Sequence, residues 1–341
     1  MNKKNVLTYA GGGGSQLSRS PIAFTMAEIL LSLTIIGVVA AITLPSLTGN
    51  INERTWNTQR KALYARMSQA ISLMPQINGY GTLTEDESGC VTEDNATEAF
   101  ITSGLSKVLK INNICDSSNL ADCGIAPKIT TLAGSTISQF PATLVGLNSR
   151  FNGSYFKPGN STDSNYYSQA NTKAAAFETA NGESIVAYYN PRCKYDTARS
   201  VTSVAYPSSW AQPYMCANFI YDLNGSKGPN TVGKDIGFIT VLYPSDPIVV
   251  APMPLRKLSE SATQTDAISL CKKLDSDSRM PNIEELAAIF YNKPLIDSSY
   301  EGISWSSSVY SVDKAWYQEL GSGGRTAYNK SAQGGVICVK R

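Results

Sequence analysis

The sequence predicts an α+β fold: a long N-terminal helix, membrane-spanning in its first half and amphipathic in its second, packs on a small antiparallel sheet, and a further α+β unit follows. Three features lead to this prediction: an apolar run, an amphipathic helical pattern directly after it, and short β-type runs between turn-rich segments. They divide the chain into a leader, a long helix, a globular domain and a C-terminal module, at residues 1–23, 24–75, 76–250 and 255–341.

The composition argues against several functional classes. The 341 residues carry a formal net charge of +2, so the chain has no overall basic footprint for a nucleic acid. It contains no histidine, which excludes Ser-His-Asp and Cys-His catalysis and His-ligated zinc. No residue spacing indicates a carboxylate-pair or Ser-Lys site. We therefore expect no enzyme and no cofactor, apart from the calcium ion considered below.

The N-terminal region has the pattern of a leader followed by a membrane helix. Residues 1–23 contain three basic side chains, no acidic one and a run of four glycines, which makes them flexible. Residues 24–45 carry a single ionisable side chain, Glu28, and would form about 33 Å of helix, enough to span a bilayer with the N-terminus in the cytoplasm. The alternatives are a cleaved secretory signal, which the length of the run disfavours, and a plain signal anchor.

The start of this helix resembles a known processing site. The segment Ala23-Phe24-Thr25-Met26-Ala27-Glu28 is similar to the cleavage site of type IV prepilins and type II secretion pseudopilins. That family has Glu, Gly and Pro at the fifth, fourteenth and twenty-second mature positions, and counting from Phe24 these are Glu28, Gly37 and Pro45. The chain departs from the family at Ala23, where Gly is usual, and at Met26-Ala27, where Leu-Ile is commoner.

The resemblance implies a processing step and a filament. A prepilin peptidase would cut between Ala23 and Phe24 and methylate the new amine. In the filament, Glu28 would neutralise the amine of a neighbouring subunit within a bundle of helices that also contains Gly37 and Pro45. The alternative for Glu28 is snorkelling to lipid headgroups without a partner. The implied partners are the peptidase, other pilin or pseudopilin subunits and the bacterial inner membrane. The precursor would lie there with a periplasmic ectodomain before it joins a pilus or pseudopilus at the cell surface.

The helix is expected to continue as an amphipathic segment that packs on a globular domain. Apolar side chains recur at helical spacing up to Pro75, where Pro and the following Asn78-Gly79 end the pattern. The residues on this face are Trp56, Leu63, Met67, Ala70, Ile71 and Met74.

The domain after the helix shows one short helical pattern and three β-type runs. The helix is predicted within 93–110, and the strands are predicted at 184–189, 217–221 and 236–242. A long helix followed by a small antiparallel sheet is the pilin-like α+β arrangement that the resemblance implies.

Seven cysteines all follow the apolar run, which indicates disulfides formed in an oxidising compartment. Cys115 and Cys123 flank a short polar loop, and a bond between them would be local. Cys193 and Cys216 flank the loop between the first two predicted strands, and a bond between them would close a hairpin. Sequence alone does not fix the pairing, and the odd number leaves one cysteine over, for which we choose Cys90.

One loop offers oxygen ligands. The segment 222–235 joins two predicted strands and carries oxygen-bearing side chains that could surround a calcium ion. It lacks the spacing of an EF-hand, and a long turn built on its Asn-Gly and Pro-Asn pairs is the favoured alternative. The candidate ligands are Asp222, Asn224, Ser226 and Asp235.

The C-terminal module carries a second resemblance. The segments 279–286 (RMPNIEEL), 304–308 (SWSSS) and 338–341 (CVKR) resemble secreted domains of the C-type-lectin fold. The resemblance implies a Cys271–Cys338 disulfide that closes the module. Trp305 and Trp316 could form an aromatic platform for a surface ligand or glycan, with core packing as the favoured alternative.

These features together predict a structural subunit: a minor pilin or pseudopilin that displays a C-terminal adhesion or recognition module. The alternative is a membrane-anchored monomeric binding protein that does not polymerise. Glu28 favours assembly over plain anchoring.

Overall fold

The computed structural model has an α+β fold and describes residues 25–77, 95–138, 140–147, 172–189, 214–243, 248–274, 276–297, 300–321 and 323–340. The chain forms two compact units, Met1–Asn52 and Glu53–Arg341, and each is described by itself. The first helix, α1 (Met26–Ile77), contributes residues to both units and passes through Pro45.

The prediction of a membrane-spanning helix is wrong for the described part of the chain, where no helix is both long enough and apolar enough to cross a membrane. The fold class is therefore corrected to α+β with a long N-terminal helix and no assigned membrane span.

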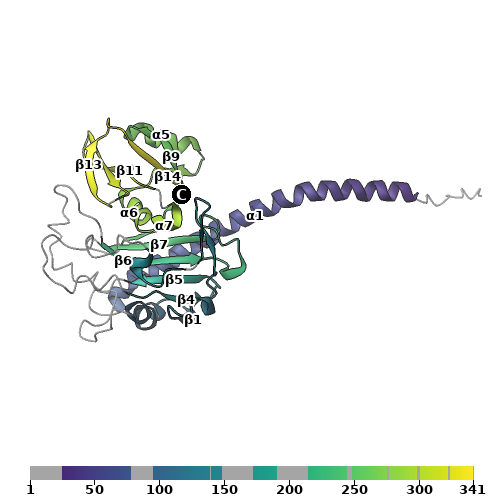
Figure 1. The fold of residues 1–341 in the computed structure, drawn as a ribbon, viewed down its shortest axis with the longest axis horizontal. Helices are drawn as coiled ribbons and strands as arrows, with labels where there is room; N and C mark the ends of the chain where they lie inside the picture. The colour runs from purple at the N-terminus through teal and green to yellow at the C-terminus, as the bar shows by residue number, and fades with distance from the viewer. Residues whose placement is uncertain are drawn as a thin grey trace, which may run out of the picture. The chain divides into compact units, whose positions relative to one another are not determined.

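The second unit is built on a six-stranded antiparallel sheet of order β1-β4-β5-β6-β7-β8 (Figure 1). Its three central strands β5, β6 and β7 include the three strands predicted from the sequence. Strands β1, β4 and β8 were not predicted, because they are short and because two exposed asparagines interrupt the apolar residues of β1. The strands are β1 (Ile111–Cys115), β4 (Ala175–Thr179), β5 (Ser184–Tyr189), β6 (Tyr214–Asp222), β7 (Ile236–Tyr243) and β8 (Ile248–Val250).

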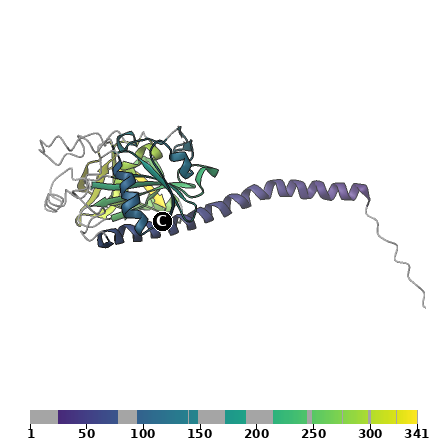
Figure 2. The same cartoon turned by 90° about the horizontal axis from the view of Figure 1, so that it is seen from below.

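One face of this sheet is covered by the second half of α1 (Figure 2). The predicted apolar face of the helix is buried here, with Leu63, Met67 and Ile71 packed in the same core as Phe177 and Phe219. A short helical segment covers the face as well, where the prediction placed a helix. It comprises α2 (Ala96–Ala99), the π-helical turn η2 (Phe100–Gly104) and η3 (Leu105–Lys107).

The opposite face of the sheet is covered by the C-terminal part of the chain. Helices α6 (Ile283–Tyr291) and α7 (Lys293–Ile296) share a core with inward side chains of β5, β6 and β7, such as Val186, Ile220 and Phe238. Figure 1 shows both helices beside β7, between the first sheet and the second.

A buried polar cluster lies in this contact. The Asn218 amide donates to Asn292 Oδ1 at 2.8 Å, and Asn292 Nδ2 lies 3.0 Å from Asn218 Oδ1 and 3.1 Å from Thr240 Oγ1. Thr240 in turn donates to Asn218 at 2.7 Å. All three side chains are fully buried, so the cluster specifies how the C-terminal part sits on β6 and β7.

The C-terminal part forms a second sheet of order β10-β14-β11-β12-β13, with β9 paired to β14. The elements are β9 (Met253–Ala262), α5 (Gln264–Leu274), β10 (Ser278–Arg279), β11 (Ile303–Val309), β12 (Lys314–Glu319), β13 (Arg325–Asn329) and β14 (Gly334–Lys340). Smaller elements of the first part are η4 (Leu120–Cys123), β2 (Ile129–Thr130), β3 (Thr136–Ile137), α3 (Leu144–Leu147) and η8 (Gly225–Lys227).

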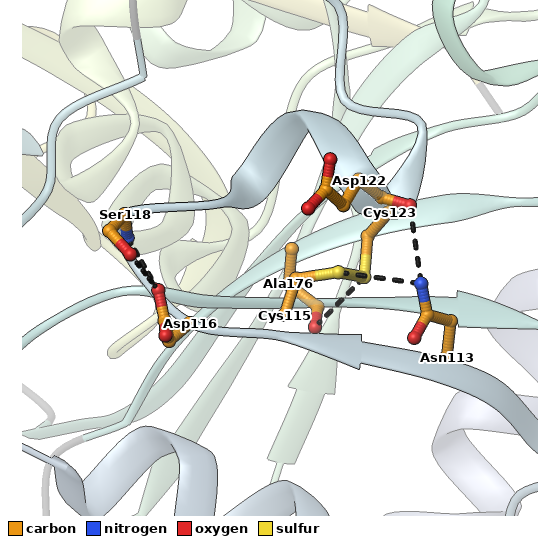
Figure 3. The surroundings of a disulfide bond; sticks show 7 residues. All are labelled: Asn113, Cys115, Asp116, Ser118, Asp122, Cys123 and Ala176. Atoms are coloured by element: carbon orange, nitrogen blue, oxygen red, sulfur yellow. Dashed lines mark hydrogen bonds between the residues drawn. A yellow bond between two sulfur atoms is a disulfide. The ribbon is translucent and has the colours of Figure 1, made fainter.

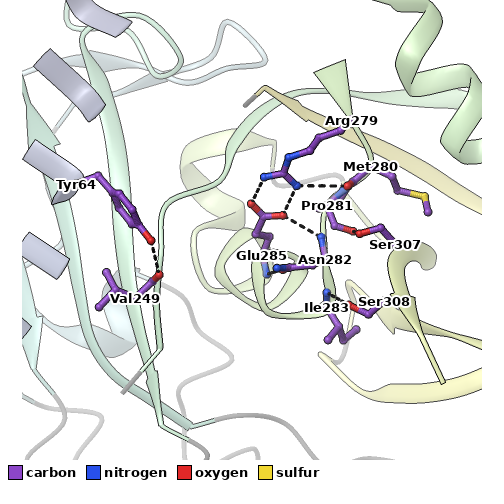
Figure 4. Close-up of polar contacts among 10 residues, drawn as sticks. All are labelled: Tyr64, Val249, Arg279, Met280, Pro281, Asn282, Ile283, Glu285, Ser307 and Ser308. Atoms are coloured by element: carbon purple, nitrogen blue, oxygen red, sulfur yellow. Dashed lines mark hydrogen bonds and ion pairs between the residues drawn. The ribbon is translucent and has the colours of Figure 1, made fainter. Parts of the chain in front are cut away.

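The start of α6 is closed by a capping box. The Asn282 side chain accepts the Glu285 N–H at 2.7 Å, and the Glu285 carboxylate accepts the Asn282 N–H at 2.9 Å (Figure 4). Arg279 donates to both oxygens of Glu285 at 2.6 Å, so this carboxylate is held by the cap and by a bidentate ion pair.

The polar cluster yields a stability prediction. Asn292→Ala should lower the free energy of unfolding by about 1–3 kcal/mol, because the Asn218 amide nitrogen would stay buried without its acceptor, Asn292 Oδ1. Urea denaturation followed by circular dichroism measures the change. Asn329→Ala, on the exposed end of β13, is the matched control and should stay within about 0.5 kcal/mol of the original protein. An equally small effect of Asn292→Ala would show that the cluster does not hold the two parts together.

Candidate functional site

The first candidate site is the N-terminal part of α1, whose first turn is closed by a Thr25–Glu28 capping box. Glu28 Oε2 accepts both the Thr25 N–H and the Thr25 hydroxyl at 2.9 Å, and the Glu28 N–H lies 3.3 Å from the Thr25 hydroxyl oxygen. This local role was not predicted, although the Thr-x-x-Glu spacing signals it. The predicted cleavage residues Ala23 and Phe24 lie outside the described residues.

The apolar side chains that follow Glu28 are exposed on every side of the helix. With 3.6 residues per turn, their positions cover the full circumference rather than one stripe. Ser32 and Thr34 are the polar residues after Glu28 in this stretch, and the Thr34 hydroxyl donates to the Leu30 carbonyl at 2.7 Å within the helix. The exposed large apolar residues are Met26, Ile29, Leu30, Leu31, Leu33, Ile35, Ile36, Val38 and Val39.

Gly37 lies in the middle of this exposed stretch. A Cβ added there would meet nothing within 4 Å, so no described part of the chain requires a glycine. A glycine inside a helix costs roughly 0.5–1 kcal/mol relative to alanine. Gly37 therefore has no role within the described fold that offsets its cost. Pro45 lies further along α1, where only the backbone is described.

Two predicted disulfides are present. Cys115 bonds Cys123 across the short loop after β1, and the Asn113 amide donates to the Asp122 carbonyl at 3.2 Å beside it (Figure 3). Cys271 of α5 bonds Cys338 of β14. Cys216 is also disulfide-bonded, but its predicted partner Cys193 lies outside the described residues, as does Cys90.

Trp305 and Trp316 do not form a shared platform, which corrects that prediction. Trp305 is fully buried and donates its indole N–H to the Ala262 carbonyl at 3.0 Å. Trp305 pairs with Tyr317 across β11 and β12. Successive residues of a strand point to opposite faces of a sheet. Trp316, which precedes Tyr317 in β12, therefore points to the face opposite Trp305, where it packs against Tyr310 with ring centroids 5.1 Å apart.

The second candidate site is the loop between β6 and β7, which begins and ends with buried carboxylates. Asp235 is fully buried, and its two oxygens accept the N–H groups of Asn230 and Thr231 at 2.8 Å each. The loop is also tied to β2, because the Thr130 N–H donates to the Asn230 carbonyl at 2.8 Å. Asp235 therefore acts as the anchor of the turn, which is the alternative favoured from the sequence.

Asp222 is in a different position. Its side chain is 4% exposed, and Oδ1 accepts the Asn224 N–H at 3.2 Å. Among the described residues, neither Asp222 Oδ2 nor Asn224 Oδ1 has a hydrogen-bond partner, and both atoms are buried. Ser226 is exposed. The structure thus reduces the predicted ligand set to two side chains with unused acceptor oxygens.

Burial raises the pKa of Asp222 to about 7, and the nearby charge of Asp235 acts in the same direction, while backbone N–H groups oppose it. Two close carboxylates and two unused oxygens suit a hard cation such as calcium, which takes oxygen ligands only. Within the described ranges, no three His, Cys, Asp or Glu side chains gather as a metal cluster, so a calcium ion here would need backbone carbonyls as well.

The raised pKa of Asp222 predicts a specific pH dependence. Between the ordinary aspartate pKa of 3.8 and about 7, the folded protein holds a proton that the unfolded chain has lost. Stability should therefore fall as pH rises through this window, by up to about 1.4 kcal/mol per pH unit, and level off above it. The side chain of Asp222→Asn cannot ionise, so the variant should not lose this stability. The urea midpoint of the variant should therefore rise relative to that of the original protein as pH increases from 4.5 to 8.

The control for this prediction is Asp313→Asn. A hydrogen bond from Ser311 is the largest effect on the Asp313 carboxyl and holds its pKa below the usual value. Asp313 is therefore ionised above about pH 5 in the folded and in the unfolded protein. This variant should show no pH-dependent difference over the same range. A pH-independent difference for Asp222→Asn as well would mean that Asp222 is ionised in the folded protein.

No model of a protein family matches the chain, and no curated protein matches it.

Proposed function

We propose that this chain is a subunit of a bacterial filament of the type IV pilin or pseudopilin class, and that residues 26–41 of α1 are its assembly segment. The observation that carries the proposal is the exposure of apolar side chains around the whole of this helix. A helix that is apolar on all sides is stable only when it is covered on all sides.

The pattern favours many neighbours over one. A helix that pairs with a single partner needs a narrow stripe at a and d positions. Here, for example, Leu31, Ile36 and Val38 lie on sides of the helix that Leu30 and Leu33 do not cover. A bundle in which each helix contacts several copies would bury all of them, at roughly 25 cal/mol for each Å² of apolar surface.

Gly37 and Glu28 fit the same arrangement. Gly37 has free space where a Cβ would be, so another helix could approach the backbone closely at this point. Glu28 Oε2 is used by Thr25, yet a carboxylate has further lone pairs with which it can accept an amine from a neighbouring subunit. The capping box holds this acceptor in a fixed orientation at the start of the helix.

The disulfides support a location of the second unit outside the cytoplasm. Two bonds join cysteines of different elements, Cys115–Cys123 and Cys271–Cys338, and such bonds persist in oxidising compartments. The adhesion role proposed for residues 255–341 stays a prediction, because no ligand site among their described residues carries it.

The test is co-expression with a prepilin peptidase. We expect a mature protein that starts at methylated Phe24 by intact mass and amino-terminal sequencing, and filaments by electron microscopy. Glu28→Ala should leave cleavage intact and abolish filaments, because the buried amine of a neighbour loses its partner. Gly37→Ala should raise helix stability by about 0.5–1 kcal/mol and still impair assembly.

Glu98→Ala, which removes an exposed carboxylate from α2, is the matched control and should assemble normally. A chain that stays uncut and monomeric would contradict the proposal and favour a monomeric surface binding protein. Normal filaments from Glu28→Ala would remove Glu28 from the assembly contact.

A second proposal is that the loop 222–235 binds calcium through Asp222 and Asn224. It rests on the unpartnered buried oxygens of these two side chains. When bound, calcium would neutralise the negative charges of the Asp222 and Asp235 carboxylates, which repel each other.

Calcium should raise the melting temperature at pH 8 by about 5 °C when its concentration is about 100 times Kd. Asp222→Asn and Asn224→Ala should abolish the shift, whereas Ser226→Ala at an exposed position should keep it. Differential scanning calorimetry with calcium or a chelator measures this. A shift that persists in both loop variants would place any calcium elsewhere.

A further inference from the structure

The side chain of Arg60 connects the loop 222–235 to α1. Its Nη2 donates to the carbonyl of Lys234, the residue directly before Asp235. Its guanidinium also lies close enough to the hydroxyl of Tyr221, the residue directly before Asp222, to act against the rise in the pKa of that hydroxyl that burial causes. Arg60 therefore contacts both stems of the loop, each one residue away from a buried carboxylate.

The surroundings hold Arg60 and its partners in place. Arg60 Nη1 donates to Asn57 Oδ1 at 2.6 Å and lies 2.8 Å from Met253 Sδ. The Tyr221 ring lies over Gly237, where an added Cβ would come within 2.2 Å of the tyrosine oxygen. Tyr221 and Gly237 are also paired across β6 and β7. Arg60 thus contacts the Lys234 carbonyl and the Tyr221 hydroxyl, and the positions of both groups depend on the conformation of the loop stems.

The rest of the second half of α1 has an independent anchor. Arg66 forms an ion pair at 2.5 Å with Glu183, a buried residue beside the β4–β5 turn. Met67, Ile71 and Met74, which follow Arg66, are buried against the sheet. A change in the loop should therefore reach residues 53–66 through Arg60 and leave residues 67–77 unaffected.

We propose that Arg60 couples cation binding in the loop 222–235 to the stability of α1 between residues 53 and 66. A cation held by Asp222 and Asn224 adds order to the first stem of the loop, and Arg60, which contacts both stems, transfers that order to the helix. The inference rests on the proposed calcium site and is independent of filament formation. It assigns Arg60 as a positioning residue and not as a ligand.

The test is hydrogen–deuterium exchange of the full chain with about 1 mM calcium chloride, a range in which extracellular sites fill, or with a chelator. Calcium should slow amide exchange in residues 53–66 by about threefold or more and leave residues 67–77 unchanged. In Arg60→Gln the slowing should disappear, while calcium still raises the melting temperature. Arg54→Gln, at an exposed position of the same helix, is the matched control and should retain the slowing.

Each outcome decides the inference. Equal slowing in Arg60→Gln and the original protein would overturn it, as would a calcium-induced rise in melting temperature without any slowing. Absence of both effects in the original protein would overturn this inference and the calcium proposal together and leave the filament proposal untouched. Should Arg60→Gln fail to fold, Arg60→Lys serves instead. It keeps the charge, but a single ammonium cannot bond both stems, so the slowing should again disappear.

Discussion

The second unit depends on one constraint, the burial of its first sheet on both faces. Along β6, Phe219 packs toward α1 and the next residue, Ile220, packs toward α6. A sheet covered twice must present apolar side chains in both directions. The consecutive buried residues Ser184–Tyr189 of β5 show the same pattern. The long helix and the C-terminal part thus pack on opposite faces of the same strands. A change in these strands would affect both of them.

This constraint explains which parts of the fold the sequence could predict. The apolar runs of β5, β6 and β7 and the helical spacing from Leu63 to Met74 are strong local signals, and these elements were predicted. Strand β1 contains Asn112 and Asn113, both exposed at the sheet edge, so its pattern resembles a loop. The residues on both sides of position 250 lie in one compact unit, Glu53–Arg341. Which surface α6 covers depends on tertiary contacts that periodicity does not contain.

The candidate sites divide in the same way. Glu28 could be selected from the sequence because a lone carboxylate in an apolar run is costly, and Thr25 three residues earlier was present as a capping signal. The opposite orientation of Trp305 and Trp316 could not be predicted, because it depends on the register of β11 and β12. The selection of Asp222 and Asn224 from four candidate ligands also needed the structure, since it rests on which oxygens the loop leaves unpartnered.

The loop 222–235 shows how such a site can persist in a stable fold. Asp235 and its two backbone donors close the turn, and Arg60 ties its stems to α1, so the loop keeps its shape through hydrogen bonds of its own. The buried carboxylate of Asp222 is then a local cost that the doubly covered sheet offsets. This differs from small metal domains, in which the ion supplies the folding energy and the protein unfolds without it. A cation bound here would act on an already folded chain, so its effect would appear as added order near the loop and Arg60 rather than as folding itself.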